Sequence, residues 1–186
     1  NSRLARWVTF LVDVMTGIPS IVAGLFAYAA MTVLLELIMG PGPAALQAVK
    51  MGFTAAVALT VLMIPVVVRS TEEMLRVVPN ELREASFALG VSQWKTIMKV
   101  VLPTSMTGIL TGIVLGLARV MGETAPLIVL LQFNTEWTFN PSTPNFATLP
   151  TVITNAYTQG GVDTPVVWGA AITLIILVMG LNLIAR

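Results

Sequence analysis

Residues 105–131 read SMTGILTGIVLGLARVMGETAPLIVLL, a predominantly apolar stretch. A helix of about 20 residues crosses a hydrocarbon core of about 30 Å, so the stretch is long enough to span a membrane. Its charged residues are Arg119 and Glu123. Because lipid offers the backbone no hydrogen bonds, an apolar segment of this length is expected to be helical.

Three further windows have the same apolar character, at residues 18–40, 45–68 and 166–185. Hydrophobic residues make up 56% of the chain and charged residues 10%, and the mean hydropathy is +0.88. These values are typical of a helical membrane protein. We therefore predict an all-α, polytopic transmembrane helical bundle whose core is residues 18–186. Residues 1–17 carry apolar side chains at helical spacing beside basic ones, which predicts an interfacial helix.

Basic residues set the orientation of the predicted spans. They gather in segment 69–104, at Arg69, Arg76, Arg83, Lys95 and Lys99, whereas residues 133–165 contain no Lys or Arg. Cytoplasmic loops of membrane proteins are enriched in Lys and Arg, so 69–104 is predicted to be a cytoplasmic loop and 132–165 an external loop. Four crossings place Arg3, Arg6 and Arg186 on the cytoplasmic side as well, which agrees with the same rule.

The residue types that the chain lacks exclude several kinds of chemistry. It has no Cys and no His, so we expect no metal site, no disulfide and no catalytic His. It has no G-x-x-x-x-G-K-[ST] motif, so any ATP would be hydrolysed by another subunit. We expect membrane lipid around the spans, no nucleic-acid partner and no catalytic residue. The chain opens on Asn1 without a signal-like segment, so we expect a longer polypeptide with upstream helices.

The cytoplasmic loop contains signals for short helices. Residues 70–73 read STEE, a capping-box pattern that predicts a helix start at Thr71, and Pro79 is expected to end that helix. Asn80 is expected to cap a second helix, and Gly90 can adopt the left-handed conformation that ends it. A helix, a turn and another helix are thus predicted under the membrane.

Residues 84–86 read EAS, Gly90 follows, and residues 100–103 read VVLP. This spacing resembles the EAA motif of the ABC importer permeases, the MetI-like fold, with Ser86 in place of the second Ala. The resemblance implies that a cytoplasmic ATPase is coupled through the residues Glu84, Ala85, Ser86 and Gly90. An alternative interpretation is an ordinary interfacial amphipathic helix that ends at a glycine. Pro103 is expected to break the helix before the third span begins.

The third span carries glycines and charges on one predicted helical face. Gly108, Gly112 and Gly116 repeat at a spacing of four residues, which lets another helix pack closely. Arg119 and Glu123 continue the same face. Charges at this depth favour a functional role, and an Arg guanidinium suits an oxyanion. Our hypothesis is that an oxyanion competes with Glu123 for Arg119 along the substrate pathway. The alternative is a buried ion pair that fastens two helices together.

Three segments together resemble the phosphate ABC transporter permeases of the PstA type. They read LVDVMTGIPS at 11–20, MIPVVVRSTEE at 63–73 and ARVMGETAPL at 118–127. The resemblance implies phosphate import across the bacterial inner (plasma) membrane by alternating access. It also implies a PstC-type sister permease, an ATPase dimer that binds ATP and Mg, and an extracytoplasmic phosphate-binding protein. Alternatives are a sulfate or molybdate permease and an anion channel or carrier that does not use ATP.

The external loop is long for a simple connection between two spans. Its aromatic residues and prolines could contact the extracytoplasmic binding protein, or the loop could fold over the outer mouth of the pathway. A short helix is expected near Leu149 to Tyr157.

Overall fold

The structure, a computed structural model, describes residues 3–131, 134, 138, 140–142, 146–159 and 164–185. All regular structure in these residues is helical. The elements are α1 (Arg3–Thr16), α2 (Ser20–Met39), α3 (Pro43–Val49), α4 (Gly52–Val77), α5 (Asn80–Ala88), α6 (Gln93–Thr96), the π-helical turn η1 (Ile97–Val101), α7 (Leu102–Met121), α8 (Ala125–Leu130), α9 (Leu149–Gln159) and α10 (Thr164–Ala185).

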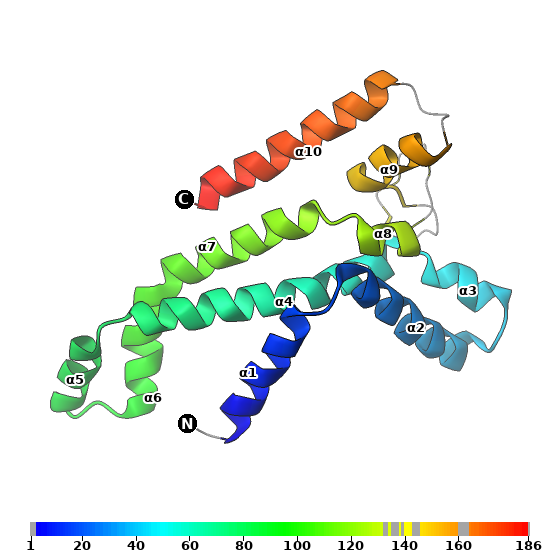
Figure 1. The fold of residues 1–186 in the computed structure, drawn as a ribbon. Helices are drawn as coiled ribbons and strands as arrows, with labels where there is room; N and C mark the ends of the chain where they lie inside the picture. Colours follow the sequence, from blue (N-terminus) through cyan, green and yellow to red (C-terminus); the bar gives the residue numbers. More distant parts are fainter. Residues whose placement is uncertain are drawn as a thin grey trace.

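Four helices in the described part of the chain are long and apolar enough to cross a membrane: α2, α4, the continuous helix Gln93–Met121, and α10. In Figure 1, α4, α7 and α10 lie side by side, and α1 and α2 approach α4 from the other side. The hairpin of α5 and α6 projects from the end that the basic residues mark as cytoplasmic (Figure 1). The predicted four-span, all-helical architecture is confirmed.

The second span differs from the prediction at both ends. Residues 43–49 form the separate helix α3, and the spanning helix α4 runs from Gly52 to Val77 instead of over 45–68. The predicted helix start at Thr71 is therefore corrected. Good helix formers continue α4 beyond the predicted span, and Arg76 pairs with Glu72 one turn earlier at 2.6 Å. The helix ends before Pro79, as predicted.

The third span also differs from the predicted range 105–131. It begins at Gln93 and continues through Pro103, because the preceding turn is π-helical: the Leu102 N–H bonds to the Ile97 carbonyl. This wider turn lets the helix accommodate a residue that lacks an N–H, so the break expected at Pro103 is absent. At the outer side the helix ends at Met121, and residues 125–130 form the separate helix α8.

The helix α4 packs against the glycine stripe of α7, which consists of Gly108, Gly112 and Gly116. A Cβ built on Gly112 would lie 2.6 Å from the Ser70 Cβ, and one on Gly108 would lie 2.6 Å from the Met74 Cγ. At Gly116 the nearest atom would be the Val67 Cγ2 at 3.5 Å, an ordinary contact. Close approach of α4 and α7 therefore requires glycine at Gly112, whereas at Gly108 the flexible Met74 side chain could move aside.

The buried core lies where α2, α4 and α8 meet. It consists of Ala27, Ala55, Ala58, Leu127, Leu130 and Leu131, with Tyr28, Leu59 and Phe146 packed against it. Phe146 belongs to the predicted external loop, and the Pro141 carbonyl accepts a hydrogen bond of 3.0 Å from the Phe53 N–H. The loop thus folds back onto the outer end of α4. The expected helix near Leu149 to Tyr157 is present as α9. Other loop residues of the prediction, among them Trp137, Phe139 and Asp163, lie outside the described residues.

Candidate functional site

Two breaks between helices and one proline inside a helix meet at one cavity. Residues 17–19 separate α1 from α2, Pro65 lies inside α4, and residues 122–124 separate α7 from α8. Between them is a cavity of about 180 Å³ lined by Met15, Thr16, Ile18, Ser20, Leu62, Pro65, Val66, Arg119, Val120 and Glu123. One ordered water needs on the order of 10–15 Å³ of such space, so the cavity can admit a tetrahedral oxyanion.

The break after α7 lies level with the middle of α4. Gly112 faces Ser70, Gly116 faces Met63 and Val67, and the cavity reaches Leu62 and Pro65. Tight turns end the helix, with the Gly122 N–H bonded to the Arg119 carbonyl at 3.2 Å and the Glu123 N–H bonded to the Val120 carbonyl at 3.1 Å. Irregular backbone at membrane depth is tolerated only inside protein or along a water-filled cavity.

Arg119 and Glu123 both line this cavity, but they do not form an ion pair with each other. Among the described residues, the ion pairs within 4.0 Å join Asp13, Arg69, Glu72 and Arg76. The expected pairing is therefore corrected. The helix ends at Met121, so Glu123 no longer lies one helical turn above Arg119. In the chain by itself Arg119 is exposed and Glu123 is half-buried.

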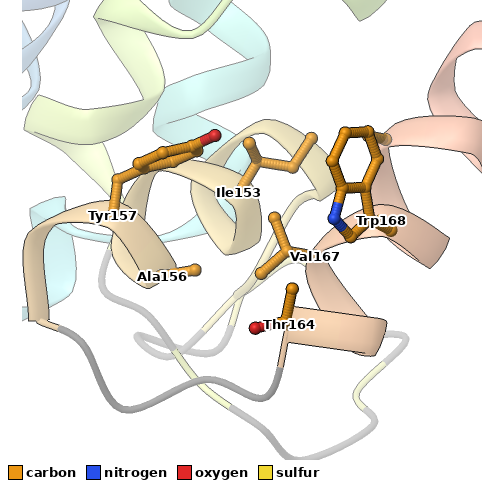
Figure 2. A pocket seen from close by; sticks show the side chains of 7 residues that line it. Ile153, Ala156, Tyr157, Thr164, Val167 and Trp168 are labelled. Atoms are coloured by element: carbon orange, nitrogen blue, oxygen red, sulfur yellow. The ribbon is translucent and has the colours of Figure 1, made fainter.

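A second cavity, of about 250 Å³, lies between α9 and α10 at the outer side (Figure 2). Its lining residues are Ile153, Ala156, Tyr157, Thr164, Val167, Trp168 and Ala171. Figure 2 shows the Trp168 indole and Val167 on the α10 side and the Tyr157 ring on the α9 side. None of these residues is charged, and Tyr and Trp are enriched at membrane interfaces. This cavity is not suited to an oxyanion, because burying an anion without a charge partner is costly.

The hairpin of α5 and α6 contains the EAA-like residues. Gly90 adopts the left-handed conformation with φ of 75°, and the Val91 N–H bonds to the Ser86 carbonyl at 3.2 Å. The predicted glycine turn is thus present. Glu84, Ala85 and Gly90 are exposed, so a partner can reach them. The N-cap prediction for Asn80 is corrected: α5 begins at Asn80, and Pro79 occupies the cap position without a side-chain hydrogen bond.

Ser86 differs from its three neighbours in the motif. It is buried, and its hydroxyl forms a hydrogen bond of 2.8 Å with the Thr96 hydroxyl. Beside it, the Arg83 Nη2 donates to the Leu75 carbonyl at 2.8 Å. These bonds join α5 to α6 and to the end of α4. The sequence analysis placed Ser86 at the partner surface, used Arg83 only as a signal of orientation and overlooked Thr96. The available signal was Ser where the motif has a small apolar residue.

Removing the bond between Ser86 and Thr96 should loosen the hairpin. We expect Ser86→Ala to reduce stability by about 1 kcal/mol, the net value of one hydrogen bond. Thr96→Val should cost at least as much, because the Thr96 hydroxyl also donates to the Ser92 carbonyl at 3.3 Å. The double variant should lose less than the sum of the two single variants, because both remove the same bond. Thermal unfolding of the purified permease measures these losses of stability. Additive losses would show that the two hydroxyls do not interact, and Ser92→Ala serves as a control outside the pair.

The chain is similar to known transport proteins. Residues 1–186 match the family described as binding-protein-dependent transport system inner membrane component. The chain is 47% identical to the phosphate transport system permease protein PstA 1 of Mycobacterium tuberculosis, over all of this chain and 58% of that protein. It is 36% identical to the PstA protein of Yersinia pestis, over all of this chain and 59% of that protein.

Among solved structures, a similar fold occurs in an inward-facing conformation of the MetNI methionine ABC transporter. The TM-score is 0.71 at 23% identity, and the match covers 98% of this chain and 73% of that chain. At this identity the likeness concerns the fold alone. The chain spans less than two thirds of the length of the curated relatives named above.

Proposed function

This chain belongs to the family of binding-protein-dependent transport system inner membrane components, and from that membership we propose that it forms part of the membrane pathway of an ATP-driven phosphate importer. The observation that carries the proposal is the cavity level with the middle of α4, whose lining includes Arg119 and Glu123. Broken helices that surround a polar site near the bilayer midplane are a recurrent arrangement in transporters. Ionisable residues at that depth mark substrate pathways.

Phosphate is the proposed substrate for two reasons. The Arg119 guanidinium is a planar donor fork that matches the oxygens of a tetrahedral anion. Relatives over the full length of this chain carry the name phosphate transport system permease. Sulfate and molybdate share the tetrahedral geometry, so they are the alternative substrates. The proposed partners are a PstC-type sister permease, a cytoplasmic ATPase dimer that binds ATP and Mg, and an extracytoplasmic phosphate-binding protein.

The hairpin and the cavity are connected by one continuous helix, which supports coupling. Glu84, Ala85 and Gly90 present an exposed surface for the ATPase, while Ser86 ties α5 to α6. From Gln93 the helix continues to Met121 and carries Arg119 near its end. Rigid helices transmit displacement, so movement of the hairpin would shift Arg119 relative to α4 and open the cavity alternately to each side.

Reconstitution into liposomes tests this function. The full-length permease, its sister permease, the ATPase and the binding protein would be combined, and uptake of radiolabelled phosphate and sulfate measured with and without ATP. We expect phosphate uptake that depends on ATP. Preferential sulfate uptake would refute the substrate, and phosphate flux without ATP would favour a channel or carrier.

A further inference from the structure

We propose that Glu123 accepts a hydrogen bond from a proton that the transported anion itself carries, so that the cavity selects proton-bearing tetrahedral oxyanions. This inference rests on the proposed function and specifies how the same site distinguishes its substrate. It assigns Arg119 and Glu123 different tasks: Arg119 contacts the anionic oxygens, and Glu123 contacts a hydroxyl group of the anion.

The charges of the cavity are balanced before any anion enters. Among the described residues, Arg119 and Glu123 are the charged side chains that line it. A site for any oxyanion would be expected to gather positive charge and to exclude a carboxylate, because like charges at short range repel strongly in a poorly hydrated site. A carboxylate beside the guanidinium therefore penalises an anion that has only acceptor oxygens.

Neither charge is neutralised by the described part of the protein. The side chains of Arg119 and Glu123 form no hydrogen bond or ion pair with other described residues. The Thr16 hydroxyl, which also lies at the cavity, already donates to the Asp13 carbonyl at 2.6 Å. A half-buried carboxylate without a donor at membrane depth is costly, so a donor on the ligand would stabilise it.

Phosphate can supply that donor, and sulfate cannot. At neutral pH inorganic phosphate retains at least one proton, so it offers acceptor oxygens to Arg119 and an O–H to Glu123. Sulfate has the same tetrahedral shape but no proton, and one of its oxygens would face the carboxylate directly. Arsenate retains protons as phosphate does, and selenate lacks them as sulfate does. Comparison of these four anions therefore separates the presence of a proton from the size of the anion.

The experiment measures anion binding to the assembled transporter without the binding protein, which would otherwise impose its own selectivity. Stabilisation of the purified full-length complex against heat is recorded as phosphate, arsenate, sulfate or selenate is added. For the unaltered protein we expect half-maximal stabilisation by phosphate and arsenate at concentrations at least about tenfold lower than by sulfate and selenate. Loss of one hydrogen bond to a charged group accounts for a difference of about this size.

In Glu123→Gln we expect this difference to shrink to within about threefold, because a neutral amide can donate to sulfate as well as accept from phosphate. Glu36→Gln, an acid on α2 that does not line the cavity, should keep the original selectivity. An unchanged ratio in Glu123→Gln would overturn the inference. If Glu123→Gln fails to assemble, the unaltered protein still tests the inference. Equal binding of all four anions, or of none, would contradict the inference. If only the inference fails, the complete reconstituted system still takes up phosphate. Failure of the inference is therefore distinguishable from failure of the proposed function.

Discussion

Arg119→Gln is expected to lower ATP-dependent phosphate uptake by about ten- to hundredfold, the range that corresponds to losing a hydrogen bond between charged groups. Arg119 is the cationic side chain that lines the cavity among the described residues, and the amide of Gln cannot replace its charge. Arg119→Lys keeps the charge but loses the two-pronged geometry, so uptake should fall less. Initial rates in proteoliposomes containing the full-length system measure both effects.

The control for this prediction is Arg6→Gln, which removes an exposed cation on α1 that does not line the cavity. Its uptake should stay within about twofold of the unaltered protein, since most surface substitutions have small effects. Co-purification with the ATPase verifies that each variant is inserted and assembled. Normal uptake in both Arg119 variants would show that Arg119 does not contact the substrate.

Gly112→Ala is expected to disrupt the packing of α7 against α4. The added Cβ would lie 2.6 Å from the Ser70 Cβ, an atom fixed directly to the backbone of α4, so the two helices would have to separate. Overpacking of this kind costs about 1–3 kcal/mol. Gly116→Ala meets its nearest atom at 3.5 Å and should be tolerated. Unfolding of the purified permease in a denaturing detergent compares the two variants.

A second substitution tests whether the clash itself causes the loss. Ser70→Gly removes the side chain that the new methyl group would meet, at a cost of about 1 kcal/mol for glycine within a helix. The pair Gly112→Ala with Ser70→Gly should therefore be more stable than Gly112→Ala alone. Equal losses of stability in Gly112→Ala and Gly116→Ala would refute the tight contact of α4 with α7 at Gly112.

The sequence predicted the spans because long apolar windows have one stable structure in lipid. The limits of the spans were less predictable. The charges of residues such as Glu72 and Arg76 predict a loop between two spans. These residues are nevertheless good helix formers and continue α4. Pro103 reads as a helix breaker, but the π-turn before it absorbs the missing hydrogen bond. Tertiary and local backbone arrangements of this kind have no signature in hydropathy.

The candidate site was only partly predictable. Arg119 and Glu123 were found because charge is rare in an apolar window, but their expected pairing depended on a helix that ends at Met121. The signals for that break were Gly122 and Pro126, which flank Glu123 in the sequence. Residues 17–19 and Pro65 lie at the same cavity because of the way in which α1, α2 and α4 pack. Sequence spacing does not contain this information.

The cavity lined by Arg119 and Glu123 is the proposed binding site of the anion. Anomalous diffraction from crystals of the assembled transporter soaked in arsenate tests it most directly, because arsenic gives a signal that carbon, nitrogen and oxygen do not. We expect an arsenic peak in the cavity, with arsenate oxygens about 2.7–2.9 Å from the Arg119 guanidinium nitrogens and an arsenate hydroxyl about 2.5–2.7 Å from the Glu123 carboxylate. A cavity without arsenic in which Arg119 pairs with Glu123, while arsenate is bound elsewhere along the pathway, would contradict it.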